Sequence, residues 1–441
     1  MNKRTFLKSA ATLASTAFIP SFGWALSKNK KLRTAHIGVG GMGGEDLKAF
    51  ASHKSVDIVA LCDVDSNALN AAKVIHPKAR TFSDYRLLLN EIGDQIDAVV
   101  VSTPDHTHAP ASLMAMDLGK AVYCQKPLTH HISEARKMAK LAKKNKLITQ
   151  MGIQVHSFYD YKLATLLIQS GIIGKVNCVR AWSPKNWGYD GLSPKSFDPI
   201  PSNLDWNLWL GTAKNHKYKE GVYHPGNWRK LIDFGRGTLG DMGVHIFDTP
   251  YNALALDVPK TIKNECRLPN GFGFPEKNKV TYIFSSTEYT TSELKWVWYD
   301  GVGAPAVHDD LILPNNDNLH DQGAMFMGEK GRLYLPHFQK LPQLIMDGEY
   351  HQIDIEKFGL GIPVRNYELE SKKHYHEFVD SCLGNARCSA PFSYASKLTE
   401  TILLGVIAGR FPGKTLHWDN ISSKFLEEEA NKFINGTYRN F

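Results

Sequence analysis

Three glycines near the start of the chain have the spacing of a phosphate-binding turn. Gly38, Gly40 and Gly43 form a G-x-G-x-x-G pattern between the apolar residues of 32–37 and a helix-like stretch. The first glycine permits the bend, the second lets a pyrophosphate approach the backbone, and the third lets helix and strand pack closely. The free N–H groups at the start of the helix attract phosphate. The pattern predicts a dinucleotide site, with Met42 as a further contact inside the turn.

A carboxylate follows the next apolar run at the position of a ribose ligand. The run Ile58 to Leu61 leads to Asp63, about 20 residues beyond the third glycine. An acid there accepts hydrogen bonds from a ribose 2′-hydroxyl and repels a 2′-phosphate. The sequence therefore favours NAD over NADP, and the alternative is a glycine-rich strand turn that binds nothing.

A second group of residues has the types needed to move a proton. Asp241 and His245 are four apart, so on a helix both side chains project from one face. Oxidation of a CH–OH group requires a proton acceptor on oxygen while hydride leaves carbon, and histidine titrates in the range suited to that step. The alternative for His245 is a packed core histidine.

Alternating strands and helices are expected to position these residues. From 56 to 154, apolar runs alternate with amphipathic stretches, which is typical of a parallel sheet whose ligands bind at the carboxyl ends of the strands. Two such ends, 102–108 and 124–128, are rich in polar residues. Strands are expected at 56–62, 96–102, 120–124 and 147–151, and helices at 66–75, 83–91, 108–118 and 131–145.

The remaining chain, 155–441, has a different pattern. A helix is expected at 161–170 and a strand at 175–182, followed by short strands at 279–285, 293–299, 331–335 and 351–355. The intervening segment 182–236 is rich in Trp, Tyr, Pro and Gly. Rings and polar groups together could form a sugar-binding wall, although buried aromatics are the alternative. Candidate substrate contacts are His224, Trp228 and Arg229, with His156 as a further candidate in the pocket.

Several ordered motifs resemble the Gfo/Idh/MocA family, named for glucose-fructose oxidoreductase, inositol dehydrogenase and a rhizopine-catabolism protein. Thr103-Pro104-Asp105 with His108 is similar to the family's Thr-Pro-Asn-x-x-His strand end, and Gln125-Lys126-Pro127 to its Glu-Lys-Pro strand end. The resemblance continues through 171–176, 240–245 and 328–331, and therefore covers nearly the whole chain after the N-terminal segment.

The resemblance implies an α/β Rossmann domain with a doubly wound parallel sheet at 32–154. An α+β domain for substrate binding and oligomerisation would follow at 155–441, with an open, mostly antiparallel sheet. His245 would accept the proton, Asp241 would orient the hydroxyl, and Lys126 would stabilise the alkoxide. Further contacts to NAD are expected from Thr103, Pro104, His108, Gln125 and Lys126.

The implied activity is NAD(H)-dependent oxidation or reduction at a CH–OH group of a sugar, glycoside or polyol. One alternative is a glycosidase that oxidises a ring hydroxyl transiently, breaks the glycosidic bond and returns the hydride to the same NAD. A non-catalytic sugar-binding relative is the other. The expected partners are a carbohydrate and further copies of the chain, and no metal site is expected because no Cys/His array has the spacing of metal ligands.

Two residues depart from the family pattern. Gln125 replaces a glutamate, so a nearby anion is lost and the pKa of Lys126 is expected to fall. Asp105 replaces an asparagine, and both residue types can cap the helix that follows.

The N-terminal residues 1–25 have the pattern of an export signal. Lys3-Arg4-x-Phe6-Leu7-Lys8 resembles a twin-arginine signal with lysine at its first arginine position, and the apolar run that follows is too short to span a membrane. A periplasmic or otherwise exported protein is expected, with ordinary secretion or a retained anchor as alternatives. No other segment approaches the roughly 18 apolar residues of a membrane helix.

Charge and cysteine content limit the remaining function classes. The net charge of +8 falls to about +5 without Lys3, Arg4 and Lys8, and the basic residues are scattered, so a nucleic-acid groove is not expected. Of six cysteines, Cys62 and Cys124 end apolar runs and are expected to be buried thiols. Cys382 and Cys388 either close a small loop or remain free.

Overall fold

The computed structural model describes residues 31–337, 340–363 and 366–441. Its first sheet has six parallel strands in the order β3-β2-β1-β4-β5-β6, as predicted for a doubly wound fold. All four residues of its central strand β4 are buried, because helices cover both faces. The strands are β1 (Leu32–Ile37), β2 (Val56–Cys62), β3 (Arg80–Phe82), β4 (Ala98–Val101), β5 (Ala121–Gln125) and β6 (Thr149–Gly152).

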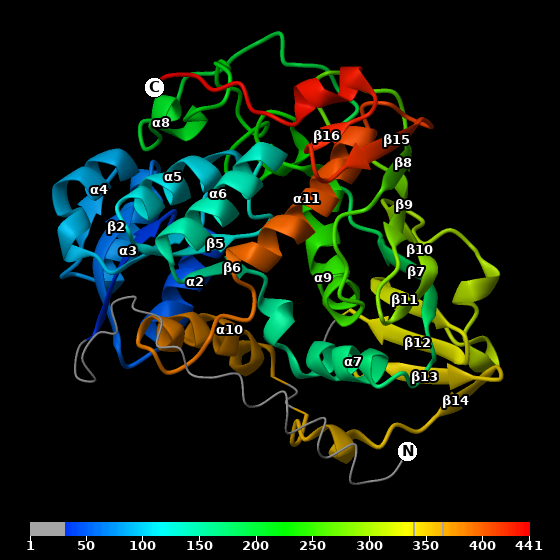
Figure 1. Cartoon of the computed structure of the whole chain (residues 1–441). Helices are drawn as coiled ribbons and strands as arrows, with labels where there is room; N and C mark the ends of the chain where they lie inside the picture. Colours follow the sequence, from blue (N-terminus) through cyan, green and yellow to red (C-terminus); the bar gives the residue numbers. More distant parts are fainter. Residues whose placement is uncertain (1–30, 338–339, 364–365) are drawn as a thin grey trace.

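Helices cover this sheet in two groups (Figure 1). On one face α4, α5 and α6 pack side by side, and on the other α2 packs with α10 (Tyr367–Cys382) from the far end of the chain. Asp65 and Asp84 cap α3 and α4 by accepting hydrogen bonds from backbone N–H groups. The helices are α2 (Met42–Ala51), α3 (Ser66–Ile75), α4 (Tyr85–Ile92), α5 (Asp105–Asp117) and α6 (Ile132–Asn145).

The second sheet has ten strands in the order β14-β13-β12-β11-β7-β10-β9-β8-β15-β16. Only the pair of β7 and β10 is parallel among its described pairs, which confirms the predicted open, mostly antiparallel sheet. The strands are β7 (Val176–Ser183), β8 (Thr261–Glu265), β9 (Asn278–Ser285), β10 (Thr290–Asp300), β11 (Gly323–Gly328), β12 (Gly331–Pro336), β13 (Gln343–Met346), β14 (Glu349–His351), β15 (Thr415–Asp419) and β16 (Lys424–Phe425).

One predicted strand, 351–355, is wrong. β14 pairs with β13 through three residues only and ends at His351, and Ile355 begins a short 3₁₀ helix that continues to Phe358. An edge strand has a neighbour on one side only, so few hydrogen bonds hold its end.

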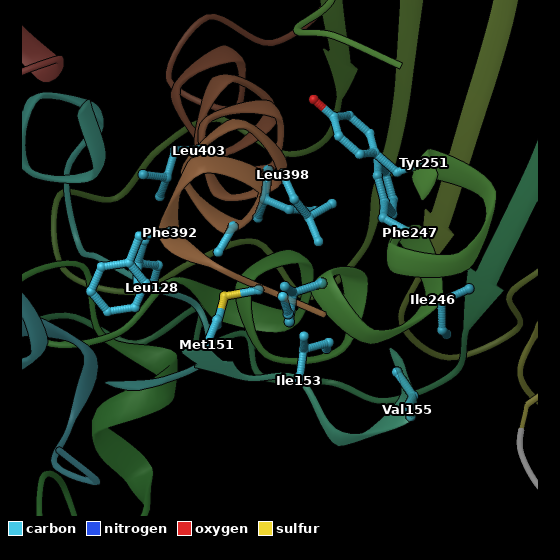
Figure 2. Packing of buried hydrophobic residues seen from close by; sticks show 14 of the residues in the cluster. Leu128, Met151, Ile153, Val155, Ile246, Phe247, Tyr251, Phe392, Leu398 and Leu403 are labelled. Carbon is cyan, nitrogen blue, oxygen red and sulfur yellow. The ribbon is translucent and has the colours of Figure 1, made fainter. Parts of the chain in front are cut away.

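A long helix joins the two sheets (Figure 2). α11 (Phe392–Ala408) packs on α6 of the first part and on α9 (Val244–Ala253) of the second. In the close view, Leu398 and Leu403 of α11 lie with Met151 from β6 and Phe247 from α9 in one buried cluster. The second part also contains α7 (Tyr159–Gln169), α8 (Trp206–Leu210) and α10 (Tyr367–Cys382).

The sequence also predicted the state of the cysteines and the character of the N-terminal segment. All six cysteines are free thiols, so Cys382 and Cys388 do not pair in this structure, and Cys62 and Cys124 are buried. The expected signal segment 1–25 lies outside the described residues. Within the described ranges, no helix combines the length and apolar character needed to cross a membrane.

Candidate active site

A cleft of about 710 Å³ runs over the carboxyl ends of the parallel strands. This volume lies within the range of about 300 to 1,000 Å³ typical of ligand sites. The glycine turn and the ends of β2, β4 and β5 form its floor. The start of α9 and parts of the coil between β7 and α9 form the opposite wall. The cleft therefore lies between the two sheets, where the sequence predicted the chemistry.

The glycine turn has the shape that its spacing predicted. Gly38 has φ +83°, and a Cβ there would lie 2.5 Å from the carbonyl oxygen of Ser102. A Cβ on Gly43 would lie 2.3 Å from the oxygen of Gly38, so only glycine lets the helix start this close to the strand. α2 begins at Met42, and Gly40, Met42 and Gly43 all line the cleft. The N-terminal end of α2, with its positive dipole end, thus lies where a pyrophosphate would be bound.

Asp63 ends β2 beside this turn. Its Oδ2 accepts hydrogen bonds from the backbone N–H groups of Val39 at 2.8 Å and Gly40 at 3.2 Å, and its Oδ1 accepts one from Asp65 at 2.9 Å. Burial raises the pKa of Asp63, and these three donors oppose the rise. The carboxylate therefore fixes the shape of the glycine turn and also lines the cleft, where a ribose hydroxyl could reach it.

The strand ends after β4 and β5 are tied together by His108. One ring nitrogen of His108 lies 2.8 Å from the carbonyl oxygen of Thr103 and the other lies 2.8 Å from that of Pro127. Burial lowers the pKa of His108 to about 4, although the two carbonyl oxygens oppose the fall. Thr103 and Pro104 line the cleft, but His108 is not among its described lining residues. Its expected contact with the cofactor stays a prediction, and in this structure the ring links the two strand ends.

Gln125, the first departure from the family pattern, has a charged partner that the sequence did not reveal. Its Nε2 donates to both carboxylate oxygens of Asp46, at 3.0 and 2.9 Å. Ser102 and Tyr375 also donate to this carboxylate, at 2.6 and 2.7 Å. Asp46 is fully buried, and burial raises its pKa. A glutamate at 125 would face a second carboxylate, whereas glutamine supplies a donor.

Asp241 joins the residues predicted to be catalytic. Lys126 Nζ donates to its Oδ1 at 2.9 Å and to its backbone oxygen at 3.1 Å. Trp187 Nε1 donates to its Oδ2 at 2.7 Å, and Arg229 Nε lies 3.3 Å from its Oδ1. Burial alone would raise the pKa of Asp241, but the charges of Lys126 and Arg229 overcome it and hold the pKa well below its usual value.

His245 lies in the same cleft with a neutral ring. Asp241 belongs to a π-helical turn, Leu239–Gly243, and His245 to the first turn of α9, so the two line the cleft together as predicted. Burial, and then the positive charge of Lys126, lower the pKa of His245 well below its usual value. Its Nδ1 is buried and has no hydrogen-bond partner among the described residues. A neutral imidazole can accept a proton from a bound hydroxyl.

Asp105, the second departure, also lines the cleft. The prediction that it caps the following helix is wrong, because α5 begins at Asp105 itself and no side chain caps it. Its side chain is 5% exposed, and burial raises its pKa to about 7 although Lys126 opposes the rise. The cleft therefore contains one carboxyl group, that of Asp105, whose pKa lies close to 7.

The residues predicted to contact substrate fall into two groups. His224, Trp228 and Arg229 line the cleft, with the Arg229 guanidinium 4.3 Å from the centre of the Trp228 ring. His224 Nε2 lies 3.1 Å from Asp65 Oδ2, so its contact is with the residue that caps α3. His156 is not among the described lining residues, because its Nδ1 is held 3.0 Å from both oxygens of buried Asp248. Gln154 lines the cleft in its place.

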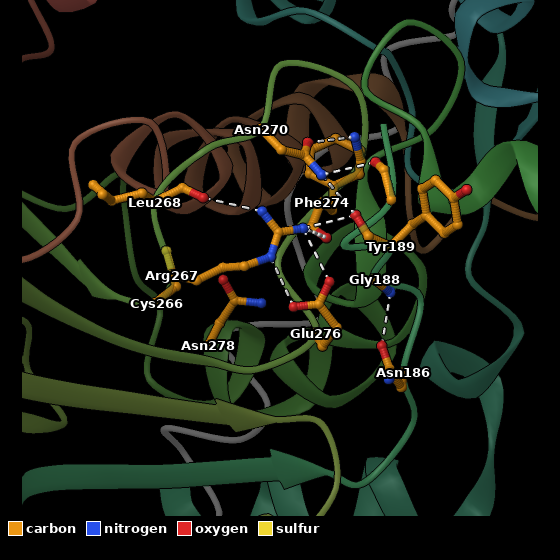
Figure 3. A network of polar contacts seen from close by, with 12 residues as sticks. Asn186, Gly188, Tyr189, Cys266, Arg267, Leu268, Asn270, Phe274, Glu276 and Asn278 are labelled. Carbon is orange, nitrogen blue, oxygen red and sulfur yellow. Dashed lines mark hydrogen bonds and ion pairs between the residues drawn. The ribbon is translucent and has the colours of Figure 1, made fainter. Parts of the chain in front are cut away.

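A polar network holds the coil that carries Trp187 (Figure 3). Arg267 pairs with Glu276 at 2.8 Å and donates to the backbone oxygens of Tyr189 and Phe274 at 2.7 and 2.9 Å. Asn270 Nδ2 donates to the same Tyr189 oxygen at 3.1 Å. Because Tyr189 follows Trp187 closely in the chain, the network fixes the indole that donates to Asp241.

Sequence reasoning missed Asp46, Trp187 and Lys185, of which the latter two line the cleft. Trp187 lies in irregular coil without periodicity, and Asp46 looks like an ordinary polar residue on a helix. Its position three residues after Gly43 was the available signal, because the start of that helix faces the cofactor. Among the described residues, no group of three or more His, Cys, Asp or Glu is arranged to hold a metal ion.

Comparison with known proteins is consistent with this geometry. A family model described as "Oxidoreductase family, NAD-binding Rossmann fold" matches residues 32–153. A second, described as "Oxidoreductase family, C-terminal alpha/beta domain", matches residues 161–271.

Curated relatives match shorter stretches. A glycosyl hydrolase family 109 protein of Stenotrophomonas maltophilia is 33% identical over 137 residues, which cover 28% of this chain and 29% of the relative. An inositol 2-dehydrogenase of Salmonella typhimurium is 27% identical over 147 residues, which cover 33% of this chain and 43% of the relative. The chain thus spans less than half the length of these curated relatives.

Solved structures match at full length but at low identity. A levoglucosan dehydrogenase in complex with NADH and levoglucosan has a TM-score of 0.64 and 15% identity, covering 88% of this chain and 99% of that one. An oxidoreductase domain protein from Kribbella flavida has a TM-score of 0.63 and 20% identity, with the same coverage. These structures share the fold. Because models of both parts of the family match in order along it, the chain belongs to the Gfo/Idh/MocA oxidoreductase family.

Proposed function

We propose that the protein is an NAD(H)-dependent oxidoreductase that acts on a CH–OH group of a sugar, a glycoside or a polyol. One observation carries this proposal: Lys126, Asp241 and His245 line the same cleft as the glycine turn and Asp63. Relatives named inositol 2-dehydrogenase and levoglucosan dehydrogenase support the substrate class.

The residues of the cleft fit a dinucleotide. The close approach at Gly38 and Gly43 and the N-terminal end of α2 suit a pyrophosphate, and Asp63 suits an unphosphorylated ribose. When bound, NAD⁺ would supply the hydride acceptor. Tight binding of NADP by the native protein would contradict the role given to Asp63.

The chain's own residues would move the proton. The neutral His245 ring would accept the proton of the substrate hydroxyl, and the Lys126 ammonium would donate a hydrogen bond to the same oxygen and stabilise the developing alkoxide. Asp241, held by Trp187 and Arg229, would keep Lys126 in place and orient the hydroxyl. His224, Trp228 and Arg229 would form the wall that contacts the sugar or the ribose beside it.

A redox-assisted glycosidase is the second candidate, and two observations favour it. The glycosyl hydrolase family 109 relative has the higher identity of the two curated relatives compared above. Asp105, with a pKa of about 7, is an acid in the cleft that could protonate a departing glycosidic oxygen. A non-catalytic sugar-binding protein is the third candidate, and the presence of Lys126, Asp241 and His245 argues against it.

One experiment separates the three candidates. The full-length protein is purified gently and incubated with NAD⁺ and a panel of aryl glycosides, free sugars and polyols, and released phenol, keto-sugar and cofactor absorbance are followed. A keto-sugar with formation of NADH supports the dehydrogenase. Released phenol without net NADH supports the glycosidase, and sugar binding without either product supports the non-catalytic protein.

Export and self-association are further parts of the proposal. The support for export is the sequence of residues 1–25, and the support for a homo-oligomer is the open ten-stranded sheet of the second part. Cell fractionation with a native N-terminus tests the first, since recovery only from the cytoplasm would contradict it. Analytical ultracentrifugation tests the second.

A further inference from the structure

The two ends of the cleft can be assigned from the strand order. Lys126 and His245 lie at the end beyond β5, and Asp63 lies at the end of β2. Ser83, Asp84 and Tyr85 line the cleft just after β3, the edge strand beside β2. A dinucleotide whose reacting ring lies at Lys126 and whose ribose lies at Asp63 must therefore place its adenine toward the β3 edge.

The ring of Phe441 lies at the end of the cleft next to β3. Phe441 lines the cleft together with Asp84, Tyr85 and Thr107. A Cβ built on Gly211 would lie 3.7 Å from Thr107 Oγ1 and 3.9 Å from Phe441 Cζ, so the ring reaches the gap between α5 and the end of α8. In Figure 1 the red end of the chain lies beside α8, far in sequence from the glycine turn.

Two arginines hold this ring in place. The Arg86 guanidinium stacks 4.0 Å from the centre of the Phe441 ring, donates a hydrogen bond to the Phe441 oxygen, and pairs with Asp84 at 2.6 Å. Arg439 donates to Asn207 Oδ1 at 2.7 Å and to the Gly211 oxygen at 2.9 Å, and its own N–H donates to Thr212 at 2.9 Å. The segment 434–441 is therefore fastened to both α4 and α8.

We propose that Phe441, backed by Arg86 and held by Arg439, forms the wall on which the adenine of the dinucleotide stacks, and that this wall slows release of the cofactor. The inference deepens the proposed function, since it requires a dinucleotide in this cleft. An aromatic ring offers the flat apolar face that a base needs, and a base–aromatic stack is worth about 1 to 3 kcal/mol. The cofactor would then remain bound between turnovers.

The test compares release of NADH from the native protein and four variants by stopped-flow fluorescence. Phe441→Ala removes the ring, and Arg439→Ala removes the bonds that position it; both should release NADH about tenfold faster or more. Phe441→Tyr keeps a ring and should release NADH at the native rate. Tyr438→Phe is the matched control, because Tyr438 bonds to Glu134 in the same segment and is not among the described lining residues.

A second measurement locates the effect at the adenine end. Reduced nicotinamide mononucleotide lacks the adenosine half, and ADP-ribose lacks the nicotinamide. Phe441→Ala should weaken ADP-ribose binding about tenfold and leave binding of the mononucleotide unchanged. Equal loss for both ligands, or native NADH release from Phe441→Ala, overturns the inference. Failure of the native protein to bind NADH at all would instead overturn the proposed function.

Discussion

Asp241 is the residue at which the charges of the cleft are balanced. One carboxylate faces two cations, Lys126 and Arg229, while burial, and then the charge of Lys126, lowers the pKa of His245. The arrangement therefore divides the work between two neighbouring groups. Lys126 remains a donor, and His245 remains an acceptor.

Removing either group should affect the chemical step rather than cofactor binding. Lys126→Ala and His245→Ala should each lower turnover by about 10² to 10⁴, the typical contribution of a general acid or base. NADH affinity should change little, because the glycine turn and Asp63 are untouched. Single-turnover kinetics with a substrate found by the panel above measure the step, and near-native rates in either variant would refute that residue's role.

Restoring the family's glutamate at 125 should destabilise the protein. Gln125→Glu places a carboxylate against buried Asp46, at the positions now joined at about 3 Å. We expect a loss of about 2 kcal/mol or more at pH 8, and less at pH 5 where the pair can share a proton. Thermal unfolding measures it. The double variant with Asp46→Asn should recover the loss, and an unchanged single variant would show that the pairing is unimportant.

The raised pKa of Asp105 predicts that the stability of the cofactor-free protein depends on pH. Its folded pKa of about 7 lies above the usual 3.8, so the folded state binds the proton more tightly than the unfolded state. The stability that this proton contributes is complete below about pH 4 and is lost as pH rises to about 7. Asp105→Asn should therefore match the native protein at pH 4 and exceed its unfolding free energy at pH 8. Urea unfolding at both values tests this, and parallel pH profiles contradict it.

At the scale of elements, the sequence predicted those helices and strands in which apolar residues recur at a regular spacing. The helix at 66–75 has the predicted bounds, and the strands at 56–62 and 331–335 differ by at most one residue. β3 and β8 were missed because they are short and polar, and alternation over three to five residues resembles coil.

Site residues could be predicted where they follow a regular helix or strand, and not where they lie in irregular chain. The glycine turn, Asp63 and the strand-end motifs follow regular elements, so their chain positions fix their places in the cleft. Trp187 and Phe441 lie in irregular chain, and their contacts with the cleft depend on tertiary packing alone. His156 was wrongly predicted to line the pocket. Its partner Asp248 is 92 residues away in the chain, and no local sequence pattern indicates that the two residues pair.

The coil that carries Trp187 provides an element-scale prediction. Trp187→Phe removes the N–H that donates to Asp241 at 2.7 Å and keeps an aromatic ring. A hydrogen bond to a charged group is worth about 1.5 to 3 kcal/mol, so turnover should fall about 10- to 150-fold while NADH release is unchanged. Trp206→Phe removes an indole N–H outside the described cleft lining and serves as the control. Equal effects of both variants would assign the loss to general destabilisation.

At the scale of the whole molecule, α11 makes the two sheets one cooperative structure. It buries side chains against α6 on one side and α9 on the other, and α10 returns to pack on α2. Neither sheet can lose its partner without exposing apolar surface of this shared core.

The described chain should therefore unfold in a single transition. Calorimetry should give equal calorimetric and van't Hoff enthalpies. Leu403→Ala, in the centre of α11, should lower the stability by about 2 to 5 kcal/mol and move the whole transition to lower temperature. Two separate transitions, or a variant that shifts only one of them, would show that the two parts unfold independently.

The packing of α10, α11 and Phe441 against elements of the first part also sets an order in time. The ribosome delivers the glycine turn early and Phe441 late, and α11 emerges between them. We expect that the nascent Rossmann half leaves the apolar face of α6 exposed until α11 arrives, and that a chaperone covers it meanwhile. Arrested nascent chains that end before 392 should therefore remain protease-sensitive and bind no dinucleotide, so that capture of the cofactor follows the emergence of α11.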